Sequence, residues 1–161
     1  MIIDECHLLK PENEGRYPAH ACNDRHGTDF WVENMRGDHL SVDAKVRAKD
    51  WAAKPEPADD LALETWSVVE KEKIGWTRDA TKRTDYVVWY WTDTGRWCLI
   101  PFPMLCRVFQ KHWKQWSQRY DTHQQYTPDY GGYHSECVFV PRIEVWNAIY
   151  LHYSGVADLK A

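Results

Sequence analysis

The sequence lacks any long uninterrupted run of apolar residues, although 43% of its 161 residues are hydrophobic. A helix that crosses a membrane needs about 20 consecutive, mainly apolar residues. The start of the chain, Met1-Ile2-Ile3-Asp4-Glu5, also lacks the basic and then apolar pattern of a secretory signal. We therefore expect a cytoplasmic protein with no membrane partner.

The sequence also lacks the pattern of a disulfide-bonded protein. Its five cysteines are odd in number and scattered, as is typical of a reducing compartment. We therefore expect free thiols. Internal repeats and low-complexity segments are absent too, and a chain of this length can bury a core without covalent help. The expectation is one domain over residues 1–161.

An excess of positive charge is the third absence, because the net charge is −4 and the isoelectric point is near 6.0. Non-specific DNA binding usually depends on a basic face. Basic residues are nevertheless concentrated in residues 102–120, which contain no acid. Arg107, Lys111 and Lys114 fall on one side of the helix expected there, so they are candidate phosphate contacts, with Lys82 and Arg83 as further candidates.

The pattern with most chemical content is an acid followed by a second acid and a lysine. Asp29 opens one apolar run, Asp43-Ala44-Lys45 lies in the next, and the turn-like Arg36-Gly37-Asp38 lies between them. Alternation along a strand places Asp43 and Lys45 on one face, and a hairpin would bring Asp29 beside Asp43. Converging carboxylates need a cation, and oxygen ligands suit Mg²⁺ or Mn²⁺. The sequence thus predicts a Mg²⁺-dependent phosphodiesterase site.

Hydrophobic periodicity and turn residues predict the order of the elements. In the strand at 39–47, we expect alternate residues from Leu40 to be buried and the polar set from Ser41 to face outward. Residues 121–135 are polar, contain Gly131-Gly132, and are predicted to form a mobile loop. The expected strands are 29–35, 39–47, 61–66, 86–91, 96–102 and 137–140, and the expected helices are 77–83, 103–120 and 142–150.

The stretch "TDFWVENMRGDHLSVDAKVRAKDW" resembles the PD-(D/E)xK nuclease superfamily, in which an Asp is followed on the next strand by (D/E)-x-K. The segments "LALETWS", "KIGWTRDATKRTDYVVWYW" and "RWCLIPFPML" follow in an order similar to that of small phage-encoded members. This resemblance covers roughly residues 26–110. It implies an α/β fold in which helices flank a restriction-endonuclease-like mixed sheet, with a helix-loop-strand-helix addition at 103–152.

The resemblance also implies a DNA-cleaving enzyme in the cytoplasm of the host cell, dependent on Mg²⁺ or Mn²⁺. Asp29, Asp43 and the carbonyl of Ala44 would hold the metal ion, with Glu64 as a further ligand. Lys45 would orient the attacking water or stabilise the negative charge that develops. Many such nucleases act as homodimers.

Two other classes of function compete with a nuclease. A catalytically silent protein with the nuclease fold could bind DNA or a host defence complex, which the acidic net charge favours. A zinc-organised interaction domain could be built on His20, Cys22 and His26, although their spacing matches no familiar zinc finger.

Overall fold

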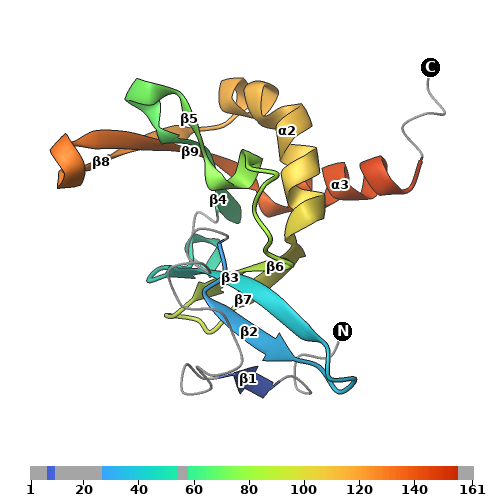
Figure 1. The fold of residues 1–161 in the computed structure, drawn as a ribbon. Helices are drawn as coiled ribbons and strands as arrows, with labels where there is room; N and C mark the ends of the chain where they lie inside the picture. The colour runs from blue at the N-terminus through green and yellow to red at the C-terminus, as the bar shows by residue number, and fades with distance from the viewer. Residues whose placement is uncertain (1–6, 10–26, 54–57, 156–161) are drawn as a thin grey trace. The chain divides into compact units, whose positions relative to one another are not determined.

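The structure is a computed structural model that describes residues 7–9, 27–53 and 58–155. In this described part the chain has an α/β architecture with two α-helices and two β-sheets (Figure 1). It divides into two compact units, and each unit is discontinuous in sequence. Unit 1 comprises residues 1–49 and 81–103, and unit 2 comprises residues 50–80 and 104–161.

Unit 1 contains a five-stranded sheet in the order β1-β2-β3-β6-β7. Strands β3 and β6 are parallel and the other neighbours are antiparallel, so the sheet is mixed, as predicted for the core. Its buried hydrophobic side chains come mainly from β6 and β7. The strands are β1 (His7–Leu9), β2 (Phe30–Glu33), β3 (His39–Arg47), β6 (Tyr86–Trp91) and β7 (Trp97–Pro101).

The predicted hairpin of β2 and β3 is confirmed, with Phe30 opposite Val42. Its turn depends on Asn34, whose side-chain oxygen accepts hydrogen bonds from the backbone N–H groups of Arg36 and Asp38. Gly37 has a φ of 79°, which a residue with a side chain rarely adopts. Sequence-local chemistry therefore closes this hairpin and fixes the register of the two strands.

The expected burial pattern of β3 is wrong in part. Ser41 and Asp43, predicted to face outward, are buried, whereas Val46 is 58% exposed. Ser41 is buried with its polar atoms satisfied, because Asp85 accepts hydrogen bonds from both its backbone N–H and its hydroxyl. The consecutive residues Ser41, Val42 and Asp43 are all buried, so both faces of β3 are covered at its centre. Alternation gives the face on which a side chain lies, but not how much of each face is covered.

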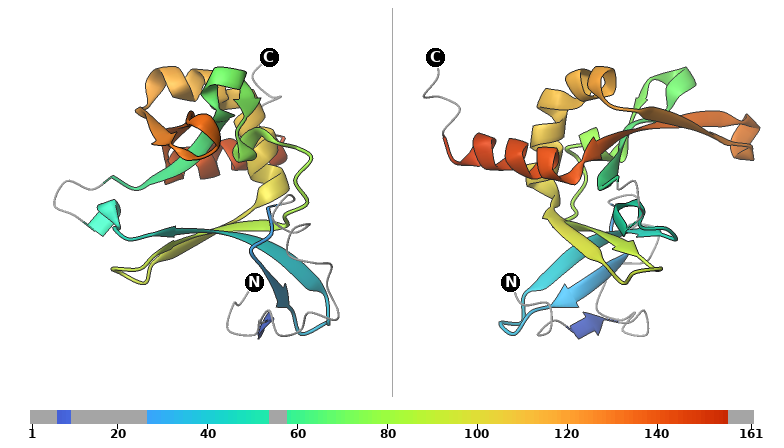
Figure 2. Two further views of the ribbon diagram at one scale, coloured as in Figure 1. Left: turned by 60° about the vertical axis from the view of Figure 1, so that its left-hand side comes forward. Right: turned by 180° about the vertical axis from the view of Figure 1, so that it is seen from behind.

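Unit 2 contains a second, fully antiparallel sheet in the order β5-β4-β9-β8 (Figure 2). The strand predicted at 61–66 is therefore present but belongs to this sheet, and not to the mixed sheet of unit 1. This strand, β4, lies between β5 and β9, and β9 is a long strand late in the sequence. The strands are β4 (Asp60–Val68), β5 (Lys73–Ile74), β8 (Thr122–Thr127) and β9 (Tyr133–Pro141).

Two further expectations about unit 2 are wrong. Most of the predicted loop at 121–135 is a β-hairpin, with β8 paired to β9 around a 3₁₀ turn at Asp129–Gly131. The helix predicted at 77–83 is a single 3₁₀ turn, Trp76–Arg78. The hydroxyl of Thr77 does not cap a helix there, because it accepts a hydrogen bond from the backbone N–H of Glu64 on β4.

The two helices lie close to their predicted positions. Helix α2 (Phe102–Arg119) follows β7, and helix α3 (Arg142–Tyr153) follows β9. Neither helix in the described part of the chain has the apolar length that a membrane crossing requires.

Aromatic packing holds α2 to the sheet of unit 2. Trp113 of α2 meets Trp66 of β4 edge to face, with 5.6 Å between ring centroids. The Arg78 guanidinium lies over both rings, 3.8 Å from the Trp113 centroid and 4.5 Å from that of Trp66. It also donates a hydrogen bond to the carbonyl of Thr65, so one cation joins the helix, the strand and the 3₁₀ turn.

Candidate active site

Asp43 and Lys45 form a close ion pair on one face of β3. The Lys45 ammonium lies 2.8 Å from each carboxylate oxygen of Asp43. The side chain of Asp43 is 10% exposed and that of Lys45 is 22% exposed. The acid-x-lysine spacing therefore places the two charges side by side, as the alternation predicts.

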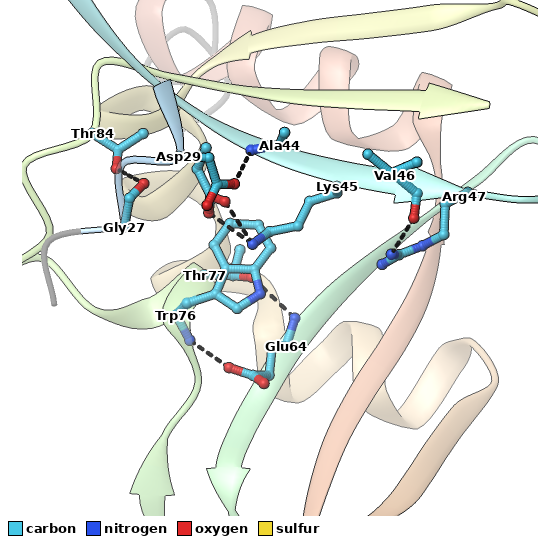
Figure 3. Close-up of polar contacts among 11 residues, drawn as sticks. Gly27, Asp29, Ala44, Lys45, Val46, Arg47, Glu64, Trp76, Thr77 and Thr84 are labelled. Atoms are coloured by element: carbon cyan, nitrogen blue, oxygen red, sulfur yellow. Dashed lines mark hydrogen bonds and ion pairs between the residues drawn. The ribbon is translucent and has the colours of Figure 1, made fainter. Parts of the chain in front are cut away.

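Asp29, the residue directly before β2, contacts the same strand β3 (Figure 3). Its backbone N–H donates to the carbonyl of Val42, which extends the hairpin by one residue. Its carboxylate accepts a 2.6 Å hydrogen bond from the backbone N–H of Ala44, the residue between Asp43 and Lys45. The hairpin thus brings Asp29, Asp43 and Lys45 together within unit 1.

The Asp43 carboxyl has a pKa raised above its ordinary value of 3.8. Burial is the main cause, because it disfavours the charged form. The ammonium of Lys45 acts in the opposite direction, and the neighbouring carboxyl of Asp29 raises the pKa further. Burial and a second acid together outweigh the lysine, so the charged form of Asp43 is disfavoured, and a further cation at the site would stabilise it.

The carboxylates of Asp29 and Asp43 are the kind of ligand that Mg²⁺ and Mn²⁺ prefer. Within the described residues, no group of three or more His, Cys, Asp and Glu side chains could hold a metal ion. Mg²⁺, however, is usually bound through one or two carboxylates, with waters and substrate phosphates as its other ligands. Asp29 and Asp43 supply two carboxylates, and the Ala44 carbonyl remains the third expected ligand.

The candidate phosphate contacts Lys82 and Arg83 also belong to unit 1. The stem of Lys82 packs beside Gly27, two residues before Asp29, and a Cβ at Gly27 would lie 3.3 Å from it. The Thr84 hydroxyl donates a hydrogen bond to the Gly27 carbonyl. This contact ties the segment that carries Lys82 to the one that carries Asp29. Arg83 is exposed.

Glu64 lies in unit 2 and is anchored locally. Its carboxylate accepts a 2.8 Å hydrogen bond from the backbone N–H of Trp76, and its own N–H donates to the hydroxyl of Thr77 (Figure 3). Gly75 is required here, because a Cβ at that position would lie 2.3 Å from the Glu64 carbonyl oxygen. Glu64 therefore has a structural partner, and its role as a metal ligand remains a prediction.

The three candidate phosphate contacts on α2, Arg107, Lys111 and Lys114, are exposed, as a phosphate-contact face requires. Lys111 lies 3.0 Å from the ring nitrogen Nδ1 of His152 on α3. Lys114 lies over the ring of Trp113. Arg107, Lys111 and Lys114 remain candidates for DNA binding.

Cysteine chemistry is a weaker basis for function. Cys98, Cys106 and Cys137 are free thiols, and the first two are buried. Burial raises the pKa of the Cys106 thiol to about 11, so the reactive thiolate is disfavoured. The zinc candidates His20, Cys22 and His26 lie outside the described residues.

Sequence reasoning missed Asp85, which positions the site through Ser41. Asp85, the residue directly before β6, accepts two hydrogen bonds from Ser41, and its own N–H donates to the Ser41 hydroxyl. These bonds join β3 to β6 two residues before Asp43. The only signal in the sequence is an acid directly before the apolar run at 86–91. This signal does not show which residue the acid contacts.

Comparison with known proteins adds no assignment, because no family model, no curated protein and no solved structure matches the chain.

Proposed function

We propose that the protein is a divalent-metal-dependent nuclease of the PD-(D/E)xK type, which hydrolyses phosphodiester bonds in DNA and is encoded by a phage. The observation that carries the proposal is the convergence of Asp29, Asp43 and Lys45 on one short hairpin. Two acids and a lysine held this closely, with one acid buried, are costly unless they serve a ligand.

Asp29 and Asp43 would hold the metal ion together with the carbonyl of Ala44. When bound, Mg²⁺ supplies Lewis-acid activation of water and neutralises phosphate charge. The hydrogen bond from the Ala44 N–H fixes the orientation of the Asp29 carboxylate. The ammonium of Lys45 now contacts both oxygens of Asp43, so it would give up one of these contacts to a metal ion.

Lys45 would then act on the substrate. Its ammonium is held at the site by Asp43, and its side chain is only 22% exposed. A fixed positive charge of this kind stabilises negative charge that develops on a phosphate, and it does so more strongly than in water. Its contribution is therefore to the transition state more than to binding of intact DNA.

The decisive experiment compares Lys45→Met with Lys49→Met, an exposed lysine four residues later. Cleavage and binding of labelled single-stranded and duplex DNA are measured with Mg²⁺, Mn²⁺ or EDTA. We expect Lys45→Met to lower turnover about a hundredfold or more, with little change in affinity for intact DNA. Lys49→Met should cleave like the parent.

One observation favours the catalytically silent alternative, because the bidentate Lys45–Asp43 pair already neutralises the buried acid without a metal ion. In that case, the parent would bind DNA or a host protein and cleave nothing under any divalent metal. Lys45→Met would then only weaken DNA binding. Cleavage by the parent in EDTA would contradict both proposals.

A further inference from the structure

The outer strand β8 presents an open sheet edge in the described part of the chain. It is the last strand in the order β5-β4-β9-β8. Its side chains are exposed from Thr122 to Tyr126, and Tyr126 is 58% exposed. An edge strand carries a row of backbone N–H and C=O groups that can pair with another strand.

The register identifies which backbone groups face outward. The N–H of Phe139 donates to the carbonyl of Asp121, so these two residues form a hydrogen-bonded pair. Such pairs alternate along an antiparallel ladder, so His123, Gln125 and Thr127 also bond to β9. The N–H and C=O groups of Thr122, Gln124 and Tyr126 therefore point away from β9 toward the open edge.

Strand β8 has none of the features that usually protect an edge. Its sequence, Thr-His-Gln-Gln-Tyr-Thr, contains no lysine, acid or proline. Its pairing with β9 runs through all six positions without a register shift, so no bulge twists the edge away. An exposed, regular and uncharged edge favours pairing with a second strand.

We propose that β8 pairs with β8 of a second copy of this chain to form a two-fold symmetric dimer. Only residues whose backbone groups face outward can form the new hydrogen-bonded pairs. Of the two-fold symmetric registers that this allows, the one centred on Gln124 uses all three outward-facing residues of β8. Gln124 faces Gln124 of the second copy, and Thr122 faces Tyr126 of that copy. Two four-stranded sheets would become one continuous sheet.

The strand that pairs with β8 comes from a second copy of the chain, because in this register β8 can face itself without bringing like charges together. Every cross-strand pair that it creates within β8 joins neutral polar or aromatic side chains. Like charges that face each other across a strand pair are destabilising, and a strand with any lysine or acid near its centre would meet its own charge. The proposal does not depend on the nuclease activity, because all of its residues lie in unit 2.

The first measurement is the mass of the full chain in solution, by sedimentation equilibrium from about 1 µM to about 1 mM. Edge pairing over five residues, 122–126, is small compared with a stable interface, so we expect a weak dimer whose fraction rises with concentration. A monomer over the whole range would overturn the proposal.

The second measurement tests the register with two lysine variants on the same edge. Gln124→Lys places two like charges opposite each other at the two-fold axis and should weaken dimerisation by about tenfold or more. Thr122→Lys adds the same charge opposite Tyr126 and should weaken it much less. Equal effects of the two variants would contradict the register.

The third measurement keeps the test valid if a lysine variant folds poorly. Opposed residues in a hydrogen-bonded pair have Cα atoms about 5.5 Å apart, which is within disulfide range. Gln124→Cys should therefore form a disulfide-linked dimer on mild oxidation. Thr122→Cys should not, because the two copies of residue 122 would be four strand positions apart, about 13 Å. Cross-linking of both variants or of neither, relative to the parent, would overturn the proposal.

Discussion

At the scale of single residues, burial of the Asp43 carboxyl lowers the stability of the protein, and the fold alone does not explain why an acid lies there. Its carboxyl is buried and has a raised pKa. An acid whose pKa is higher in the folded than in the unfolded state binds a proton more readily when folded, so stability falls as the pH rises above 3.8 through the folded pKa. At neutral pH the charged Asp43 therefore destabilises the fold, as is common at functional sites.

We expect Asp43→Asn to remove this pH dependence while also removing activity. The amide resembles the protonated acid, so the free energy of unfolding should fall less for the variant than for the parent between about pH 4 and pH 7. Mg²⁺-dependent cleavage should drop about a hundredfold or more, because one of two carboxylates is lost. Urea unfolding at several pH values and DNA cleavage assays measure the two effects.

The matched control is Asp93→Asn, the same substitution in the exposed turn between β6 and β7. Asp93→Asn should cleave DNA like the parent. Mn²⁺ should also stabilise this variant as it stabilises the parent, because a ligand that binds the folded state raises the free energy of unfolding. Full activity of Asp43→Asn at equal enzyme and metal concentrations would remove Asp43 from the site.

How far the sequence predicts the site depends on how local the interactions are. Asp43 and Lys45 are two residues apart, and Asp29 joins them through a hairpin whose turn is encoded by Asn34 and Gly37. All three could be predicted from spacing. Asp85 could not, because its bonds to Ser41 span 44 positions in the sequence and depend on which strands become neighbours.

At the scale of elements, the difference between local and long-range interactions also explains which strands the sequence predicts and which it does not. Residues 86–91 form a strand within their predicted bounds because their apolar residues are typical of a buried strand. Strand β8 is exposed along most of its length, so it has no hydrophobic alternation and resembles a polar loop. Strand β4 was expected in the mixed sheet because its sequence gives a strand but not its neighbour, which is β9, more than 70 residues later.

Arg78 is expected to stabilise the packing of α2 on the sheet of unit 2. Its guanidinium lies over Trp66 and Trp113 and bonds to the Thr65 carbonyl. Arg78→Met keeps a long apolar stem but removes the cation and the hydrogen bond, so we expect a loss of about 1–2 kcal/mol. Arg107→Met, on the exposed face of α2, should change the free energy of unfolding little. Urea unfolding of both variants measures this, and equal stabilities would contradict the role of Arg78.

The exposed basic face of α2 is expected to contact DNA phosphates. Replacing Arg107, Lys111 and Lys114 together by Gln should weaken binding and reduce the slope of log affinity against log salt by about two to three, at just under one unit for each lost contact. The matched control replaces Arg36, Lys71 and Lys73, three other exposed cations, by Gln. DNA-binding titrations at several salt concentrations measure the slopes. An equal reduction by the two triple variants would mean that net charge is responsible and not this face.

At the scale of the whole molecule, the chain passes between its two units three times, so neither unit is a continuous segment. The residues that carry the proposed chemistry, Asp29, Asp43 and Lys45, all belong to unit 1. The residues that carry the proposed dimer belong to unit 2. A metal ion and a second copy of the chain are therefore expected to act on different parts of the backbone.

Hydrogen exchange can separate these effects in one sample. A metal ion held by Asp29, Asp43 and the Ala44 carbonyl binds only the folded hairpin, so Mg²⁺ or Mn²⁺ should slow amide exchange in β2 and β3. The β8–β9 hairpin serves as the internal reference and should exchange at the same rate with or without metal at a fixed protein concentration. In Asp43→Asn the protection of β3 by metal should be lost, while the reference stays unchanged. Uniform slowing of both units in the parent would instead indicate non-specific stabilisation by the ion, and would contradict a metal site confined to unit 1.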